Sequence, residues 1–189
     1  MNIIHTSDYQ SFVKEIKEKI RDAQYQALKA VNQELIRLNW DIGRAIVEKQ
    51  DELGWGKSVV GTLSKDLQNE FPGIQGYSSQ NLWRMRKFYL TYQGNEKLAP
   101  LVREIGWSHN IVVLEKCKDD LQREFYIRMT MKFGWTKSVL VHQIESEAYE
   151  RFLLNQTNFD KALEAKYRHQ ASLAVKDRYN FDFLEFRRG

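Results

Sequence analysis

The sequence predicts an all-α fold, and three observations support that class. Only two prolines, Pro72 and Pro100, interrupt the 189 residues. No segment alternates apolar and polar residues for long enough to form a half-buried strand. Apolar residues instead recur every three or four positions along most of the chain, which is the spacing of one helix face. A chain of this length can bury an adequate core in one domain, or in one domain with an extension.

The bulk composition excludes several classes of protein. Hydrophobic residues make up 42% of the chain and charged residues 29%, which is typical of a globular protein rather than a disordered one. The net charge of +4 is compatible with binding to nucleic acid but does not establish it. No secretory signal is visible, and no window approaches the roughly 18 apolar residues of a membrane-spanning helix. We therefore expect a cytoplasmic protein without a membrane partner, and we interpret the single Cys117 as structural.

A long helical segment is predicted near the N-terminus, over residues 8–53. This segment contains no proline and a single glycine, Gly43. One straight helix of this length would measure roughly 65 Å, whereas a compact chain of this size has a radius of gyration of about 16 Å. Its apolar residues follow helical spacing: Phe12, Ile16, Ile20, Ala23, Ala27, Val31, Leu35, Leu38, Ile42 and Ile46.

That length leaves two alternatives, a folded-back hairpin or a projecting helix that packs against a second copy. Because no turn signal occurs between Asp22 and Asp41, we favour projection and a homodimer or higher oligomer. The residues expected at the contact between copies are Ile16, Ile20, Val31, Leu35, Leu38 and Ile42.

Two shorter helices are predicted next, around a turn. The first covers residues 57–71, and a Pro-Gly pair ends it. A further glycine lets the chain turn again, and Ser78 or Ser79 can cap a second helix that extends to about Tyr92. The second helix is expected to bury one face: Leu82, Met85, Tyr89 and Tyr92.

This pair of helices is a candidate helix-turn-helix, with the second helix as the recognition helix. Three basic residues and no acidic one lie between Tyr77 and Tyr92, which suits a surface that faces phosphates. Gln and Asn can bond an adenine edge, and Arg a guanine edge. The alternative is an ordinary solvated helix, because a turn of about six residues is longer than the three or four of the tightest motifs. The candidate DNA-binding residues are Lys57, Ser79, Gln80, Asn81, Arg84, Arg86 and Lys87.

The rest of the chain is also predicted to be helical. A winged helix would place a strand hairpin after the recognition helix, but residues 98–107 show no alternation, which leaves the wing unsupported. Glycine-tryptophan pairs begin at Gly54, Gly106 and Gly134 and are interpreted as joints, in which glycine ends a helix in a left-handed turn and tryptophan fills the corner. The expected helices lie at about 108–117, 119–133, 136–154 and 159–176, before an aromatic strip over residues 175–186.

Several segments together resemble the N-terminal domain of the bacterial YhcG-like family. The resemblance covers nearly the entire chain, in order. It implies a helical DNA-binding module that normally continues into a PD-(D/E)XK nuclease domain. It also places Gln80, Asn81, Arg84, Arg86 and Lys87 in the DNA-reading helix of that family. The matching segments are LNWDIG at 38–43, GWGKSVVGTLSKDLQNEFPG at 54–73, SQNLWRMRKFY at 79–89, GWSH at 106–109, REFY at 123–126 and NFDFL at 180–184.

The residues of such a nuclease are not recognised in this sequence. Catalysis would need an Asp and a Glu-x-Lys on neighbouring strands, so that two carboxylates hold a divalent metal. The Glu-x-Lys matches at 15–17 and 164–166 lie in helical context and are interpreted as surface ion pairs. The four histidines lack the spacing of metal ligands. We therefore expect no catalysis, cofactor, metal or small-molecule substrate in this chain.

The expected organisation is a helical DNA-binding and self-association domain over residues 1–154, with an extension over residues 155–189 that leads toward a nuclease domain. The expected function is to bind DNA and to oligomerise on behalf of a nuclease-type protein. The alternative is a protein-interaction module that docks a nuclease to partner subunits without binding DNA itself.

Overall fold

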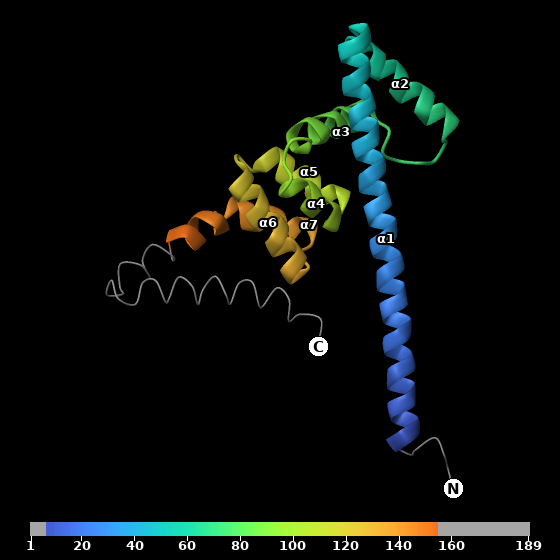
Figure 1. Ribbon diagram of the computed structural model, residues 1–189, viewed down its shortest axis with the longest axis vertical. Coiled ribbons are helices and arrows are strands. Elements are labelled where there is room, and N and C mark those ends of the chain that lie inside the picture. Colours follow the sequence, from blue (N-terminus) through green and yellow to red (C-terminus); the bar gives the residue numbers. More distant parts are fainter. Residues whose placement is uncertain (1–6, 155–189) are drawn as a thin grey trace. The chain divides into compact units, whose positions relative to one another are not determined.

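The computed structural model describes residues 7–154, which are helical apart from short connections (Figure 1). These residues contain no strand, so the all-α prediction is confirmed and no wing follows the central helices within the described range. The helix expected at 159–176 and the aromatic strip at 175–186 lie outside that range. The elements are α1 (Ser7–Leu53), α2 (Lys57–Glu70), α3 (Ser79–Tyr92), α4 (Leu98–Leu101), the 3-10 helix η2 (Val102–Glu104), α5 (Trp107–Lys116), α6 (Asp120–Phe133) and α7 (Lys137–Glu145).

The chain forms two compact units, one up to Ile111 and one from Val112 onward. In the first unit, α1 is a single uninterrupted helix of 47 residues, so the hairpin alternative is wrong (Figure 1). Such a helix is about 70 Å long. Ion pairs one turn apart stabilise its solvated faces, for example Lys19 with Glu15 at 2.6 Å. Each pair of this kind contributes only about 0.2–0.5 kcal/mol, so the helix depends mainly on what it packs against.

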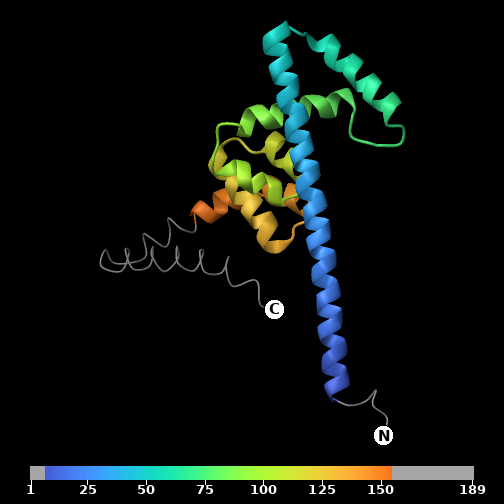
Figure 2. The same cartoon turned by 45° about the vertical axis from the view of Figure 1, so that its right-hand side comes forward.

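The C-terminal half of α1 crosses α3 in close contact (Figure 2). Gly43 makes the crossing possible, because a Cβ atom at this position would collide with the backbone carbonyl of Met85. Beside it, the ring of Trp40 meets Phe88 and Tyr89 edge to face, with centroid distances of 5.9 and 5.1 Å. Two α1 side chains, Ile36 and Ile46, are buried in this half. The crossing therefore supplies the core of the first unit.

The buried face of α3 differs from the expected one at a single position. Phe88 is fully buried, whereas Tyr89, which was expected there, is half-buried. The expectation was wrong because Phe88 lies at the centre of an aromatic cluster that the spacing alone does not reveal. Its ring meets those of Trp40, Tyr92 and Trp107 at centroid distances between 5.1 and 5.9 Å.

The connection between α2 and α3 runs from residue 71 to residue 78, and hydrogen bonds fix its far end. The buried Ser64 hydroxyl of α2 donates to the carbonyl oxygen of Tyr77 at 2.8 Å. Gln68 Nε2 donates to the same oxygen at 3.2 Å. Gly76 adopts a φ of 124°, a conformation that side chains rarely allow. These contacts determine where α3 begins.

The second unit contains α6, α7 and a helical stretch over residues 148–154. Thr136 caps α7 by accepting a hydrogen bond from the Val139 amide at 3.3 Å. The helix expected over residues 136–154 is interrupted at Glu147, which has a φ of 56°. Cys117 is buried, and this burial raises the pKa of its thiol to about 12, which fits the structural role expected for it.

Candidate nucleic-acid interface

The N-terminus of α3 is the first part of the candidate interface. Ser78 is its N-cap, and its hydroxyl accepts a hydrogen bond from the amide of Asn81 at 3.2 Å. No acidic residue lies in the first turn. The exposed Gln80 and the half-buried Ser79 follow the cap directly. A helix start of this kind carries a partial positive charge and accepts anionic groups.

Asn81, a predicted base-reading residue, makes contacts inside the first unit. Its Nδ2 donates to the carbonyl oxygen of Gly76 at 2.5 Å. Its Oδ1 accepts a hydrogen bond from the indole Nε1 of Trp107 at 3.0 Å. Both ends of the amide therefore hold the turn before α3 and the start of α5 in place. These two bonds fix the orientation of the amide and engage one of its two N–H groups and one of its two oxygen lone pairs.

The basic residues of α3 occupy different surroundings. Lys87 is exposed, whereas Arg84 and Arg86 are half-buried. The Nε of Arg86 donates to Oε1 of Gln50 at 2.5 Å, and its guanidinium lies 5.7 Å from the ring centre of Trp83. These two partners are neutral, so they orient the positive charge of Arg86 without cancelling it.

Two of the predicted DNA-binding side chains thus lie outermost on α3, namely Gln80 and Lys87. Together with Arg84 they are separated by four and then three positions, and side chains at this spacing share one helix face. Lys57 lies apart from them in the sequence, as the first residue of α2. The connection between α2 and α3 is longer than the three or four residues of a tight helix-turn-helix, so the tight form of that motif is absent here.

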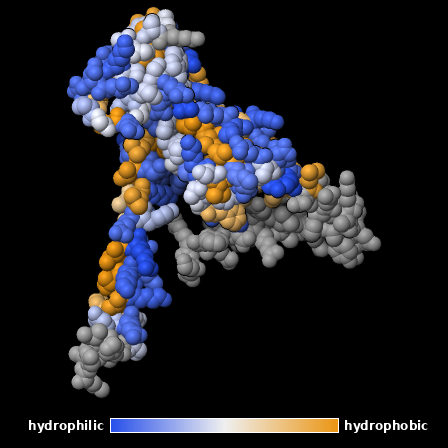
Figure 3. Space-filling model, turned by 180° about the vertical axis from the view of Figure 1, so that it is seen from behind, coloured by the Kyte–Doolittle hydropathy of each residue, from blue (hydrophilic) through white to orange (hydrophobic). Residues whose placement is uncertain are grey.

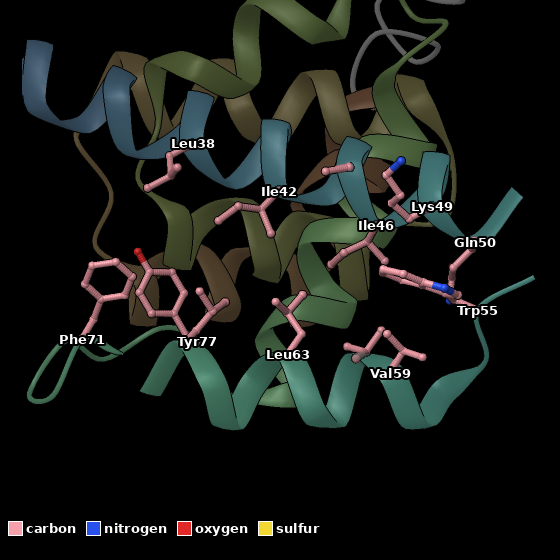
Figure 4. A pocket seen from close by; sticks show the side chains of 13 residues that line it. Leu38, Ile42, Ile46, Lys49, Gln50, Trp55, Val59, Leu63, Phe71 and Tyr77 are labelled. Atoms are coloured by element: carbon pink, nitrogen blue, oxygen red, sulfur yellow. The ribbon is translucent and has the colours of Figure 1, made fainter. Parts of the chain in front are cut away.

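A second candidate surface is an apolar groove between α1 and α2, which we call the α1–α2 groove (Figure 4). Its volume is about 420 Å³. On its floor, Val60 of α2 packs with Ile46 of α1 in the cluster that also contains Leu82 and Met85. Large apolar side chains stay exposed along its edges, among them Trp55 at 43% and Phe71 at 42%. The side chains that line the groove from α1 are Leu38, Ile42, Ala45, Ile46, Lys49 and Gln50.

The groove leads into an exposed apolar stripe along α1, visible as hydrophobic patches on the surface of that helix (Figure 3). Five of the six predicted self-association residues are exposed, by 38% to 59%. The sixth, Ile42, is half-buried against the cluster around Ile46. We call the following set the α1 stripe: Tyr9, Phe12, Ile16, Ile20, Leu28, Val31, Leu35 and Leu38.

Sequence reasoning found the stripe but missed the groove. The helical spacing of Leu38 and Ile42 predicted that this face would be covered. It could not indicate that α2 would stand away from α1 and leave a space between Ile42 and Leu63 (Figure 4). The only available signal was that α2 carries its own apolar face at Val59 and Leu67.

Within residues 7–154 no group of three or more His, Cys, Asp or Glu side chains is arranged to hold a metal ion. Glu15, from one Glu-x-Lys match, forms an exposed ion pair with Lys19. The other match, at 164–166, lies outside the described residues. No described helix has the length and apolarity needed to cross a membrane.

Comparison with known proteins identifies the family. The model of the DUF1016 N-terminal domain matches residues 15–151. The chain is also 26% identical to the "Putative nuclease YhcG" of Escherichia coli (strain K12), over 96% of its own length and 57% of that protein. No solved structure gives a significant match. The chain belongs to the family of the DUF1016 N-terminal domain, and it spans less than two thirds of its curated relative.

Proposed function

From this family membership, we propose that the chain is a DNA-binding and self-association module of a nuclease-type protein, without catalysis of its own. The observation that carries the proposal is the outer face of α3, where Gln80 and Lys87 are exposed beside Arg84. No acidic residue occurs anywhere in α3. The name of the relative, a putative nuclease, supports a nucleic acid as the ligand of this face.

Each residue of the face has a distinct role in the proposal. Lys87 and Arg84 neutralise backbone phosphates, which gives affinity without sequence preference. Arg86 does the same from a position fixed by Gln50 and Trp83. Gln80 lies one turn nearer the N-terminus of α3 than Arg84 and is the residue suited to read a base edge. Asn81 is given a positioning role instead, because Gly76 and Trp107 already engage its amide.

A second candidate function is a protein-docking module that carries the nuclease to partner subunits and does not bind DNA. The observation in its favour is an apolar surface rather than a basic one. Along the α1–α2 groove and the α1 stripe, large hydrophobic side chains are exposed to solvent. Exposed apolar surface of this extent marks interaction with another protein. Self-association would account for the same surface.

Fluorescence anisotropy with a labelled duplex over a salt series separates the two functions. Binding through about three to five phosphates predicts that log K falls against log salt with a slope of roughly −3 to −5. Lys87→Ala should weaken binding to all sequences alike and reduce that slope by about 1, whereas Gln80→Ala should cost about 1–3 kcal/mol on a preferred sequence only. Lys118→Ala, which removes an exposed charge from the second unit, is the matched control and should leave binding unchanged. A complete lack of binding at low salt would favour the docking module.

A further inference from the structure

The α1–α2 groove and the α1 stripe form one continuous apolar surface. Leu38 belongs to both, and it joins the stripe toward the N-terminus to the groove toward the C-terminus. Along this surface Tyr9, Ile20, Val31 and Ile42 are spaced by 11 residues. An 11-residue apolar repeat has a period of about 3.67 residues per turn, close to that of a straight α-helix, so the surface drifts around α1 by only about 20° per repeat and favours a shallow right-handed crossing. A single partner helix could follow all of it.

We propose that a second copy of this chain covers the surface, through an antiparallel pairing of the two α1 helices in which the first turns of one α1 fill the α1–α2 groove of the other. The inference rests on the self-association part of the proposed function and specifies its geometry. Pairing of identical chains about a two-fold axis brings the same surface from both copies together. The occupant of the groove must therefore come from the same apolar surface.

The positions along α1 favour the antiparallel direction. If the axis passes between Leu28 and Val31, near the middle of the helix, then Leu28 lies opposite Val31 of the partner subunit. Ile20 then lies within one residue of the position opposite Leu38 of the partner subunit. The segment opposite the groove is the stretch around Val13, and it carries the aromatic side chains of Tyr9 and Phe12 as well as Ile16. Bulky apolar groups thus meet the part of α1 that lines the groove.

A parallel pairing fits the same surface poorly. Each groove would then face the groove of the other copy, and its volume of about 420 Å³ would stay unfilled. The distribution of charge along α1 also favours the antiparallel pairing. Residues 8–29 carry five Lys or Arg and four Asp or Glu, whereas residues 31–53 carry three Lys or Arg and five Asp or Glu. The antiparallel direction places the slightly positive half against the slightly negative half.

The size of the surface is sufficient for a stable dimer. Forty residues of helix extend over about 60 Å, and a strip about 10 Å wide along this length covers roughly 600 Å². The walls of the groove add to that footprint, which brings it near the ~800 Å² per partner of a standard interface. A single bound peptide could cover the groove alone, but it would leave the stripe from Phe12 to Leu35 in solvent.

Disulfide trapping between mixed variants tests the pairing in the full chain. Cys117 is first replaced by alanine, and Ile20→Cys and Leu38→Cys are made separately, at positions exposed by 53% and 44%. Under oxidation, a mixture of the two variants should give a covalent dimer. Each variant alone should give none, because its two cysteines would lie about 28 Å apart along the helices in an antiparallel pair. Circular dichroism of each variant verifies that it is folded.

A second pair of variants tests whether the groove is filled. Trp55→Cys, at the end of the groove near Gln50, should cross-link to Tyr9→Cys in a mixture and not when either is oxidised alone (Figure 4). Trp55→Cys with Ile20→Cys is the matched control and should stay uncross-linked. Cross-linking of the first pair without the second would overturn the groove assignment and leave a simple helix pair.

Light scattering on the same samples separates failure of this inference from failure of the proposed function. A dimeric mass with self-cross-linking of each single variant would mean parallel pairing, which overturns the inference and leaves self-association in place. A monomeric mass with no cross-link would overturn both the inference and self-association, and would leave DNA binding to be judged by anisotropy. The expected result is a covalent dimer in two mixtures, Ile20→Cys with Leu38→Cys and Trp55→Cys with Tyr9→Cys. No covalent dimer is expected from any variant oxidised alone.

Discussion

The two halves of α1 share one helix but differ in what covers them. From residue 29 onward the helix is in contact with α3 and η2, and Ile36, Gly43 and Ile46 are buried there. From Ser7 to Leu28 every side chain is exposed except the half-buried Val13. Both halves carry apolar residues at helical spacing. The difference shows that periodicity identifies the apolar face of a helix, but not whether other parts of the same chain cover it.

The largest effect is expected where the C-terminal half of α1 packs on α3. Phe88→Ala should lower the free energy of unfolding by about 3–5 kcal/mol, because it removes a fully buried ring that contacts Trp40, Tyr92 and Trp107. Urea denaturation followed by circular dichroism measures this loss. Leu90→Ala, at a residue of α3 that is 38% exposed, is the control and should change stability by less than about 1 kcal/mol. Equal effects of the two variants would contradict the packing described for this half.

A smaller loss is expected at the crossing of the two helices. Gly43→Ala should lower the free energy of unfolding by about 1–3 kcal/mol, although alanine is the better helix former, because the new Cβ collides with the Met85 carbonyl. Gly61→Ala in α2 is the matched control, since a Cβ there meets no atom within 4 Å. It should raise stability by about 0.4–1 kcal/mol. If both substitutions stabilised the protein, α1 and α3 would not approach as closely as described.

A positioning role for Asn81 predicts a loss of similar or smaller size. Asn81→Ala should lower the free energy of unfolding by about 1–2 kcal/mol, since it leaves the Trp107 indole and the Gly76 carbonyl without this partner. Its effect on DNA affinity should be equal for all sequences. Anisotropy on several duplexes checks this point, and a loss confined to one preferred sequence would return Asn81 to the base-reading role that the sequence predicted.

The smallest effect on stability is expected in the exposed α1 stripe. Val31→Asp should leave the helical content and the unfolding midpoint of dilute protein nearly unchanged, because Val31 is 59% exposed. The same change should abolish self-association, since it places a charge at the centre of the proposed interface. A marked loss of stability in dilute, monomeric protein would mean that the stripe is covered within one chain.

Much of the fold could be predicted from the sequence because its signals are local. The absence of proline, with Gly43 as the single glycine, favoured a continuous α1, and Ser78 and Ser79 were both candidates for the cap of α3, which is Ser78. The rest depends on partners that are distant in the sequence. Phe88 and Tyr89 both suit a helical stripe, and Trp40 and Trp107 determine which one is central. Helical spacing alone cannot decide which of two adjacent residues is buried when the side chains that pack against them are unknown.

The candidate site was predicted less completely, for the same reason. Residue type and helix face identified Gln80 and Lys87, and both are exposed. The same reasoning selected Asn81, whose hydrogen-bond partner Trp107 lies 26 positions away. Left-handed glycines were expected at all three glycine-tryptophan joints, and they occur at Gly54 and Gly134 but not at Gly106. At Gly106 the carbonyl oxygen accepts hydrogen bonds from the amides of His109 and Asn110 in the first turn of α5, so this glycine precedes a helix rather than ending one.

Light scattering of the chain at micromolar concentration tests the central claim most directly, namely that the α1 stripe is covered by a second copy. The account predicts a mass near 45 kDa, twice the 22.5 kDa of one chain, that returns to the single-chain value in Val31→Asp. A 22.5 kDa species that persists on concentration of the unaltered protein would contradict it.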